Sequence, residues 1–335
     1  MGSASSTENA LGSFDKLNPD LILDAVEATG RAVNGRLLAL NSYENRVYQV
    51  GIEDERPVVA KFYRPNRWTT DAIVEEHVFT HELAAVEIPV IAPLSDPSGN
   101  TVFEHGGFRF ALFPSVGGRA PQLDNVDELE QLGRLLGRIH NIGALHPFQH
   151  RVAIDPKRLG FDAAEYVLSQ DLLPDDLRES YAAITRDVLE KVRQKFSESS
   201  PFEVIRLHGD SHVGNVLVQG EQFALVDFDD TCNGPRIQDL WMLLSGERDY
   251  RQARLGDVLT GYLEFAEFDP RELHLVEALR ALRQINYAAW LSLRHREPAF
   301  VAAFPWFRER NYWDRHILAL REQSAALDEP DLIWD

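Results

Sequence analysis

Residues 207–215 read "LHGDSHVGN", with two histidines, an aspartate and an asparagine around two glycines. Metal binding is one interpretation, because His208 and His212 are four residues apart and would share a helix face. Gly209 and Gly214 disfavour a helix, however, and the glutamate of an H-E-x-x-H zinc motif is missing. A second interpretation is a tight turn in which the polar side chains cap local backbone groups.

A third interpretation is a phosphoryl-transfer loop of the form H-x-D-x-x-x-x-N, followed by a second aspartate. Phosphoryl transfer needs a carboxylate that orients the attacking hydroxyl, and oxygen ligands that bind magnesium on the phosphates. Asp210, Asn215 and Asp227 supply these groups, and the spacing from Asp210 to Asn215 matches a kinase loop. Asp227 follows a predicted hairpin, which should return its carboxylate beside Asn215. His208 completes the catalytic set, and we expect it chiefly to order the loop by hydrogen bonding.

The upstream sequence contains the other parts of a nucleotide site. "VVAKFY" places Lys61 in a strand, where a kinase has the lysine that neutralises the α and β phosphates. Glu76 follows on a predicted helix, positioned to pair with Lys61, and Glu75 is the neighbour that would substitute for it. Taken singly, Lys61 could be a strand-edge residue and Glu76 a solvated helix charge. Their order ahead of the 207–215 motif favours a kinase-like site.

The spacing of apolar residues predicts an α+β chain with two lobes. Three β-rich runs between residues 35 and 65 form an antiparallel meander, a helix starts at Thr70, and two further strands end at Pro114. The rest is mainly helical, with a single predicted helix over about 161–197 and short β-rich runs within 203–227. We therefore expect a tail over 1–17, a nucleotide-binding lobe over 18–114 and a catalytic and substrate lobe over 115–335.

Two features differ from a protein kinase. No G-x-G-x-x-G loop joins the first two strands; "LNSYENRV" stands there, and we expect Ser42 and nearby backbone N–H groups to contact the phosphates, although an ordinary hairpin turn is the alternative. Phe113 and Ser115, at the junction of the lobes, are expected to meet the adenine. Because only seven residues separate Asp227 from Pro235, we expect no regulation through a phosphorylated activation loop.

The bulk composition excludes several classes of partner. A net charge of −19 opposes nucleic acid and anionic membrane surfaces, while it suits a cationic acceptor, either a small molecule or a basic protein tail. Cys232 is the single cysteine, and no run of 18 apolar residues or secretory signal is present, so we expect a cytoplasmic protein. We also expect a monomer.

Other candidates have two interpretations each. His77 and His81 are four apart on a predicted helix and could bind a metal, but a surface or satisfied pair is favoured. Asp229 and Asp230 could be auxiliary metal ligands or solvated, and Asp239 could stabilise the catalytic loop or lie on a helix surface. Four aromatic residues favour core packing over a substrate wall: Trp290, Phe304, Trp306 and Trp313.

"LHGDSHVGN", "LVDFDD" and "GPRIQDLWMLL" together resemble the aminoglycoside phosphotransferase and choline kinase branch of the kinase-like fold. "LNSYENRVYQV", "KFYRPNRW" and "FPSVGGR" are, in addition, similar to the stress response kinase A family of bacterial cytoplasmic Ser/Thr protein kinases. The resemblance implies Asp210 as proton acceptor, Asn215 and Asp227 as magnesium ligands and Ser42 as an ATP contact. It also implies dependence on ATP and Mg²⁺ and a role in stress.

Three functions remain open from sequence. The resemblance favours phosphorylation of Ser/Thr hydroxyls on proteins. The short segment after Asp227 offers no peptide-docking loop and so favours a small acceptor such as homoserine, choline or an aminoglycoside. A nucleotide-binding scaffold without turnover is disfavoured, because a scaffold has no physical need for the full set of Lys61, Asp210, Asn215 and Asp227.

Overall fold

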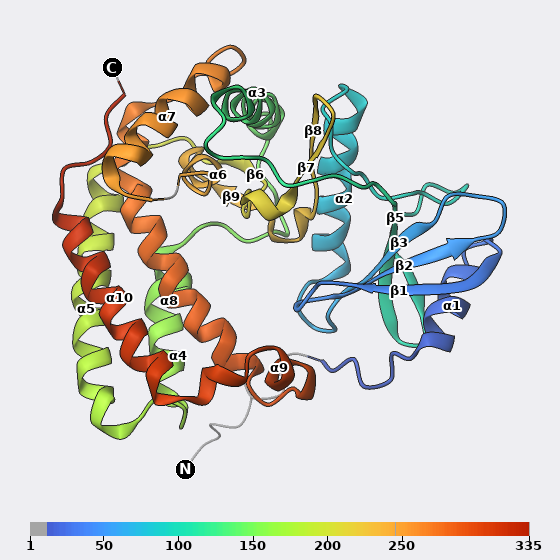
Figure 1. Cartoon of the computed structure of the whole chain (residues 1–335), viewed down its shortest axis with the longest axis horizontal. Coiled ribbons are helices and arrows are strands. Elements are labelled where there is room, and N and C mark those ends of the chain that lie inside the picture. Colours follow the sequence, from blue (N-terminus) through green and yellow to red (C-terminus); the bar gives the residue numbers. More distant parts are fainter. Residues whose placement is uncertain (1–11, 245, 335) are drawn as a thin grey trace.

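The computed structural model describes residues 12–244 and 246–334, which form two lobes (Figure 1). The first lobe is a five-stranded antiparallel sheet in the order β1-β2-β3-β5-β4. The meander predicted from the three β-rich runs is confirmed. The strands are β1 (Val33–Leu40), β2 (Arg46–Ile52), β3 (Val58–Phe62), β4 (Phe103–His105) and β5 (Phe108–Pro114).

Strand β3 presents its residues alternately to two faces of the sheet, as extended chain requires. Ala60 and Phe62 are fully buried in the cluster beneath α1 (Pro19–Glu27). Lys61 lies between them and faces α2 (Thr70–Ala85), where its ammonium is 3.7 Å from the Glu76 carboxylate. The two-residue period of the strand therefore directs Lys61 to the site side.

Residues 12–17, part of the expected tail, are described by the structure and contain a buried side chain. Residues 1–11 lie outside the described part of the chain, but Phe14 is buried and its ring stacks on Phe108 with centroids 5.9 Å apart. Burial of an aromatic ring is strongly favourable, so residues 12–17 pack on the sheet. Helix α1 then begins where expected, with the Asn18 side chain accepting a hydrogen bond from Leu21 N at 2.9 Å.

Helix α2 is attached to both lobes. Its Glu82 pairs with Arg206 of the second lobe at 2.8 Å. Just beyond the helix, Val90 forms a parallel bridge with Leu225, so this segment extends along β8 (Gln222–Leu225). Figure 1 shows α2 between the large sheet and the β7–β8 hairpin. The position of Glu76 is thus fixed by contacts to the second lobe.

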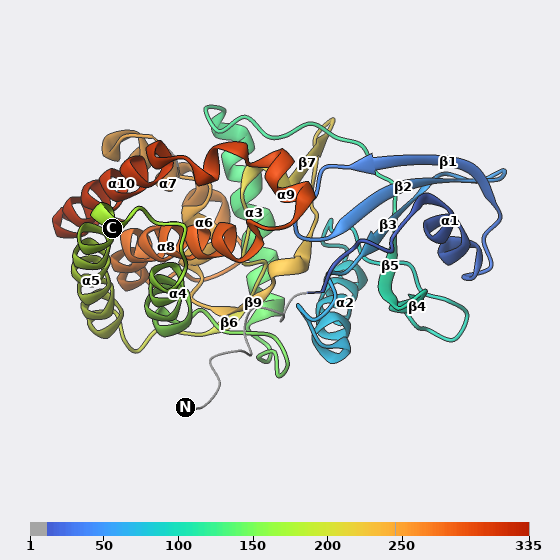
Figure 2. The ribbon, with the colours of Figure 1, turned by 90° about the horizontal axis from the view of Figure 1, so that it is seen from below.

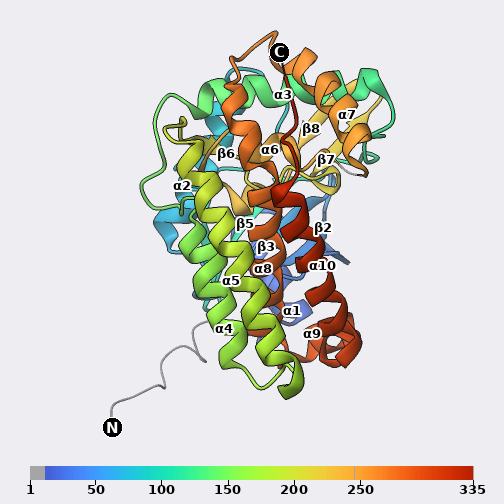
Figure 3. The ribbon, with the colours of Figure 1, turned by 90° about the vertical axis from the view of Figure 1, so that its left-hand side faces the viewer.

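The second lobe is mainly helical, and Figure 3 shows α4, α5, α8 and α10 side by side. The single helix expected over 161–197 is two helices, because residues 170–174 break it before Pro174, which cannot continue a helix. No helix of the described chain is long and apolar enough to cross a bilayer. The helices are α3 (Val126–Gly143), α4 (Ala163–Ser169), α5 (Asp175–Glu198), α6 (Ile237–Trp241), α7 (Arg248–Tyr262), α8 (Val276–Arg294), α9 (Pro298–Ala303) and α10 (Arg310–Asp328).

Two small antiparallel sheets lie at the junction of the lobes (Figure 2). The predicted hairpin is confirmed as β7 (Val216–Gln219) and β8 (Gln222–Leu225). β6 (Ile205–Leu207) pairs with β9 (Cys232–Gly234), a strand too short to be predicted from its sequence. The 207–215 motif connects these two sheets, and so it lies beside the cleft between the lobes.

Candidate active site

His208 is fully buried beneath the catalytic loop. Its Nε2 lies 2.9 Å from the Val226 carbonyl, and its Nδ1 is 3.3 Å from the backbone N–H of Asp210. A neutral ring protonated at Nε2 satisfies both contacts, donating at one nitrogen and accepting at the other. The ring therefore connects the start of the loop to the residue that precedes Asp227.

Asp239, on α6, stabilises the same loop from below. Its carboxylate accepts hydrogen bonds from the backbone N–H groups of His208 and Gly209, both at 2.8 Å, and is fully buried. His140 on α3 is its third partner, at 3.2 Å. Gly209 has φ +84°, a conformation that favours glycine. The prediction that Asp239 stabilises the loop is confirmed, and the alternative of a surface charge is excluded.

Asp210 turns its carboxylate toward α8 of its own lobe. Oδ1 is 2.7 Å from Nη1 of Arg283, on α8, and Oδ2 is 3.4 Å from Nε2 of His212. Burial raises the pKa of this carboxyl, but His212 and Arg283 outweigh it and lower the pKa below its usual value. Asp210 is therefore ionised at neutral pH. The Asn215 side chain donates to the Asp210 carbonyl at 2.9 Å, which leaves its amide oxygen as the acceptor end.

Asp227 lies next to Asn215, as the hairpin predicted, because Val226 N donates to the Asn215 carbonyl at 3.0 Å. Asp227 adopts the left-handed conformation with φ +60°. Its Oδ1 is 2.8 Å from the ammonium of Lys61, while 54% of its side chain stays exposed. The structure therefore brings the lysine of the first lobe to the acidic residue that ends the hairpin.

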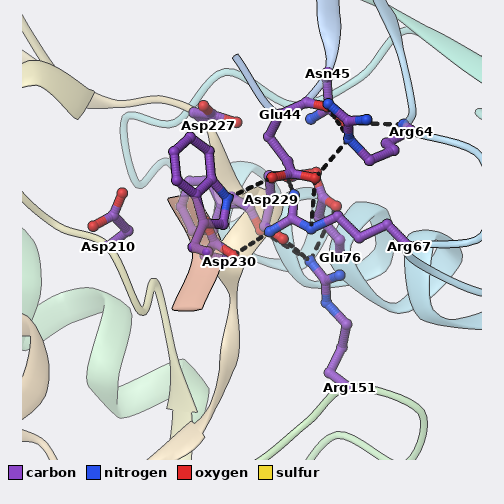
Figure 4. A network of polar contacts seen from close by, with 12 residues as sticks. Glu44, Asn45, Arg64, Arg67, Glu76, Arg151, Asp210, Asp227, Asp229 and Asp230 are labelled. Atoms are coloured by element: carbon purple, nitrogen blue, oxygen red, sulfur yellow. Dashed lines mark hydrogen bonds and ion pairs between the residues drawn. The ribbon is translucent and has the colours of Figure 1, made fainter. Parts of the chain in front are cut away.

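A chain of buried ion pairs continues from Lys61, and Figure 4 shows its members Glu76, Arg151, Asp229 and Arg67. Glu76 lies between Lys61 and Arg151, with an oxygen 3.1 Å from the Arg151 guanidinium. Arg151 also donates to the carbonyls of Phe228 and Asp229, at 3.2 and 2.8 Å. Burial alone would lower the pKa of Lys61, but Asp227 and Asp229 raise it well above its usual value, so the ammonium stays charged.

Glu75 has a different role from its neighbour. Its carboxylate accepts hydrogen bonds from three successive backbone N–H groups, at residues 149–151, with distances of 2.6 to 2.9 Å. It thereby orders the loop that carries Arg151. Sequence reasoning missed Arg151, since it belongs to no motif and its contacts with Glu76 and residues 228–229 are all long-range.

Arg67 forms ion pairs with Asp229 and Asp230, the two acidic residues that were candidates for auxiliary metal ligands. Its guanidinium bonds to Asp229, which is buried, and to Asp230. Asp229 also lies 3.2 Å from the Lys61 ammonium. These contacts favour ion pairing over metal binding, and Asp229 is not solvated. His77 is likewise satisfied, by the Tyr63 hydroxyl and Thr101, each at 2.7 Å.

The loop between β1 and β2 is joined to the second lobe through Glu44. Trp290, on α8, donates from its indole to Oε2 of Glu44 at 2.7 Å, and Arg294 of the same helix pairs with the same oxygen. From the first lobe, Arg64 lies 3.0 Å from the Glu44 carboxylate. Burial raises the pKa of Glu44, but the surrounding arginines outweigh this and lower it. Glu44 is thus an ionised bridge between the lobes.

A cavity of about 520 Å³ lies beneath this loop and contains three of the predicted site residues in its wall. Those three are Ser42, Asp210 and Asp227. Phe113 and Ser115 do not line this cavity; Ser115 accepts a hydrogen bond from Gln49 at 2.7 Å, at the end of β5. Trp290 lines the cavity, whereas Trp313 is fully buried in the helical core.

The side-chain oxygen atoms of Asn215 and Asp227, which flank the β7–β8 hairpin, are suitable ligands for a hard cation. Asp227 offers a carboxylate and Asn215 an amide oxygen, the ligand types that Mg²⁺ prefers. Within residues 12–244 and 246–334, no group of three or more His, Cys, Asp or Glu side chains is arranged to bind a metal. A Mg²⁺ here would accordingly complete its coordination with phosphate oxygens and water, as is usual for this ion.

Comparison with known proteins agrees with this geometry. Residues 36–276 match the phosphotransferase enzyme family. "Stress response kinase A" of Escherichia coli is 44% identical over 332 residues, which are 97% of this chain and 98% of the relative. "Serine/threonine protein kinase RdoA" of Salmonella typhimurium is 43% identical over 320 residues, 95% of this chain and 96% of the relative.

Solved structures show the same fold at low identity. A microcompartment-associated aminopropanol kinase aligns with a TM-score of 0.69 at 19% identity, covering 92% of this chain and 96% of its own. The amicoumacin kinase hAmiN, in complex with AMP-PNP, Ca²⁺ and its ligand, aligns with a TM-score of 0.66 at 18% identity, covering 88% and 94%. The two-lobed fold expected from sequence is therefore confirmed. The chain belongs to the phosphotransferase enzyme family and, within it, to the stress response kinase A group of kinases.

Proposed function

We propose that this protein transfers the terminal phosphoryl group of ATP to Ser/Thr hydroxyls of other proteins, with Mg²⁺, in the cytoplasm under stress. The observation that carries the proposal is the 2.8 Å contact between Lys61 and Asp227 across the cleft, beside the ionised Asp210. A lysine, a metal-binding carboxylate and a carboxylate base on one cavity are the parts that phosphoryl transfer requires. A monomer suffices, since one chain supplies all of them.

Each residue has a role that its position supports. Lys61, fixed by Glu76, neutralises the α and β phosphates, and Ser42 with its loop contacts them from above. Asp227 and Asn215 would hold Mg²⁺, which supplies charge neutralisation at the phosphates when bound. Asp210 accepts the hydrogen bond of the acceptor hydroxyl and orients it in line. Phe113 and Ser115 lie at the end of β5, where we place the adenine. His208 acts as a positioning residue.

The choice of a protein acceptor rests on the names of the relatives, one of which is called a serine/threonine protein kinase. The alternative is a small alcohol. In its favour, two solved structures with this fold are named as kinases of small molecules, and only seven residues separate Asp227 from Pro235, with α6 beginning at Ile237. The chemistry proposed for Asp210 and Asp227 is the same in both cases.

One experiment separates these functions. The purified protein is incubated with labelled ATP and Mg²⁺, together with a bacterial protein mixture or, separately, with a panel of small alcohols. We expect label in protein bands, and none with Asp227→Ala. Label only in small molecules would support the alternative. Nucleotide binding without transfer to either would remove the kinase proposal.

A further inference from the structure

The acidic residues of the cavity wall have basic partners. Lys61 pairs with Asp227 at 2.8 Å, and Arg67 pairs with Asp230. These contacts neutralise the acidic wall on the nucleotide side, so this wall offers little charge to an incoming cationic acceptor. The acids matched in this way are Glu44, Asp227, Asp229 and Asp230.

The lining of the cavity also includes two arginines, Arg158 and Arg283. Arg158 donates to the Ala153 carbonyl at 3.0 Å and, among residues 12–244 and 246–334, forms no ion pair. Arg283 bonds to Asp210 at 2.7 Å, and 48% of its side chain is exposed. Solvent screens the exposed part of the Arg283 side chain and so weakens its pair with Asp210, which is 22% exposed. Both guanidinium groups are therefore available to a ligand.

The two arginines belong to one surface. Arg158 is on the irregular helical turn η1 (Lys157–Asp162), which packs against α8. Gly160 of this turn is so close to Leu282 that a Cβ there would lie 2.8 Å from the leucine side chain. Leu159 and Leu282 line the same cavity as the two arginines. Apolar side chains and two guanidinium groups therefore share this cavity with Asp210.

We propose that Arg158 and Arg283 form an anion subsite that selects protein acceptors with an acidic residue near the phosphorylated Ser or Thr. The inference rests on the proposed function, whose acceptor it defines further. Guanidinium groups bind carboxylates through two parallel hydrogen bonds. An acceptor carboxylate would take Arg283 from Asp210, and this exchange leaves Asp210 Oδ1 open to the acceptor hydroxyl. Binding of the correct acceptor thus frees the catalytic carboxylate.

The net charge of −19 predicts the opposite selectivity, a preference for acceptors with basic flanking residues, since it attracts a cationic acceptor. A library of Ser/Thr peptides distinguishes the two, with Asp, Asn or Lys placed in turn at each flanking position. Transfer from labelled ATP is measured as kcat/KM. We expect the wild-type protein to prefer Asp over Asn by about tenfold to a hundredfold at one or more positions, the range of a charge-assisted hydrogen bond.

Substitutions of Arg158 and Arg283 test whether these residues cause the preference for Asp over Asn. Arg158→Gln and Arg283→Gln should each reduce the Asp-to-Asn ratio toward one while the KM for ATP stays unchanged. Arg283→Glu should shift the preference toward Lys. The matched control is Arg280→Gln on the same helix, whose guanidinium lies over Trp241 at 5.8 Å, away from the cavity, and which should retain the ratio.

Three results would overturn the subsite: a wild-type preference for Lys or Asn, an unchanged ratio in both glutamine variants, or a rise in the KM for ATP as the sole effect of Arg283→Gln. The failure of the proposed function gives a different result, in which no peptide is labelled but small alcohols are. In that event the same variants are compared on anionic and neutral alcohols. An equal preference of wild type and variants there contradicts the subsite.

Discussion

Lys61 and Asp227 are 166 residues apart in sequence and 2.8 Å apart in space. The contact joins the third strand of the first lobe to the end of the hairpin in the second. Glu76 and Asp229 surround the same ammonium at 3.7 and 3.2 Å, so Lys61 carries its charge in a buried position. The molecule therefore has the cleft and the convergent charges that the sequence motifs require of a phosphotransferase.

Asp210→Ala should slow phosphoryl transfer by about two to four orders of magnitude, because it removes the group that orients the acceptor hydroxyl. ATP binding should change little, since Asp210 contacts Arg283 and His212. Single-turnover transfer and calorimetric ATP binding measure the two effects. Unchanged transfer would remove Asp210 from the mechanism.

His208→Gln tests whether the buried imidazole positions the loop or takes part in proton transfer. Both ring nitrogens contact backbone groups, at Val226 and Asp210, and the ring is fully buried. We expect kcat to fall while the shape of its pH profile stays the same. Loss of a limb of the profile in the variant would instead show that His208 titrates during catalysis.

Glu44→Gln should loosen the loop that carries Ser42. The substitution weakens charged contacts to Arg64 and Arg294 on the two lobes. Because a charged hydrogen bond contributes about 1.5–3 kcal/mol, we expect the KM for ATP to rise by about tenfold or more, with a smaller change in kcat. Glu53→Gln, an exposed position just beyond β2, is the matched control. If Glu44→Gln and Glu53→Gln raised the KM for ATP equally, the contacts of Glu44 between the lobes would not be what positions the loop.

Glu272 predicts a pH dependence of stability. It is buried, its carboxylate accepts a hydrogen bond from Ile237 N at 2.9 Å, and burial raises its pKa to about 7. A carboxyl whose pKa is raised on folding contributes stability below its unfolded value near 4.5, and this is lost as pH rises through about 7.

Glu272→Gln removes this titration and retains a side-chain oxygen that accepts the hydrogen bond. Relative to the wild type, the variant should gain up to about 3 kcal/mol in the free energy of unfolding between pH 5 and pH 8. Urea unfolding at both pH values measures the double difference. If the free energy of unfolding changed equally with pH in the wild type and the variant, Glu272 would not be the group responsible for the pH dependence.

The sequence by itself determined which residue types form the candidate site and in what order they follow one another along the chain. Lys61 alternates with apolar residues, so the period of a strand directs it away from the core, and the five-residue step from Asp210 to Asn215 defines a loop motif. The β7–β8 hairpin after Asn215 is equally local. These features depend on residues close together in the chain, which is why the fold class, the meander and the hairpin could be predicted.

Only the tertiary structure decided which charges meet. Arg151 reaches Glu76 across 75 residues, Glu44 reaches Arg294 across 250, and Arg283 reaches Asp210 across 73. No sequence periodicity encodes such pairs, because each pair depends on how the two lobes pack and on which carboxylates are desolvated in the fold. The same packing buried Phe14. The pairing of buried charged side chains is a property of the folded chain, and it decides which charges in the cavity lining are left without a partner.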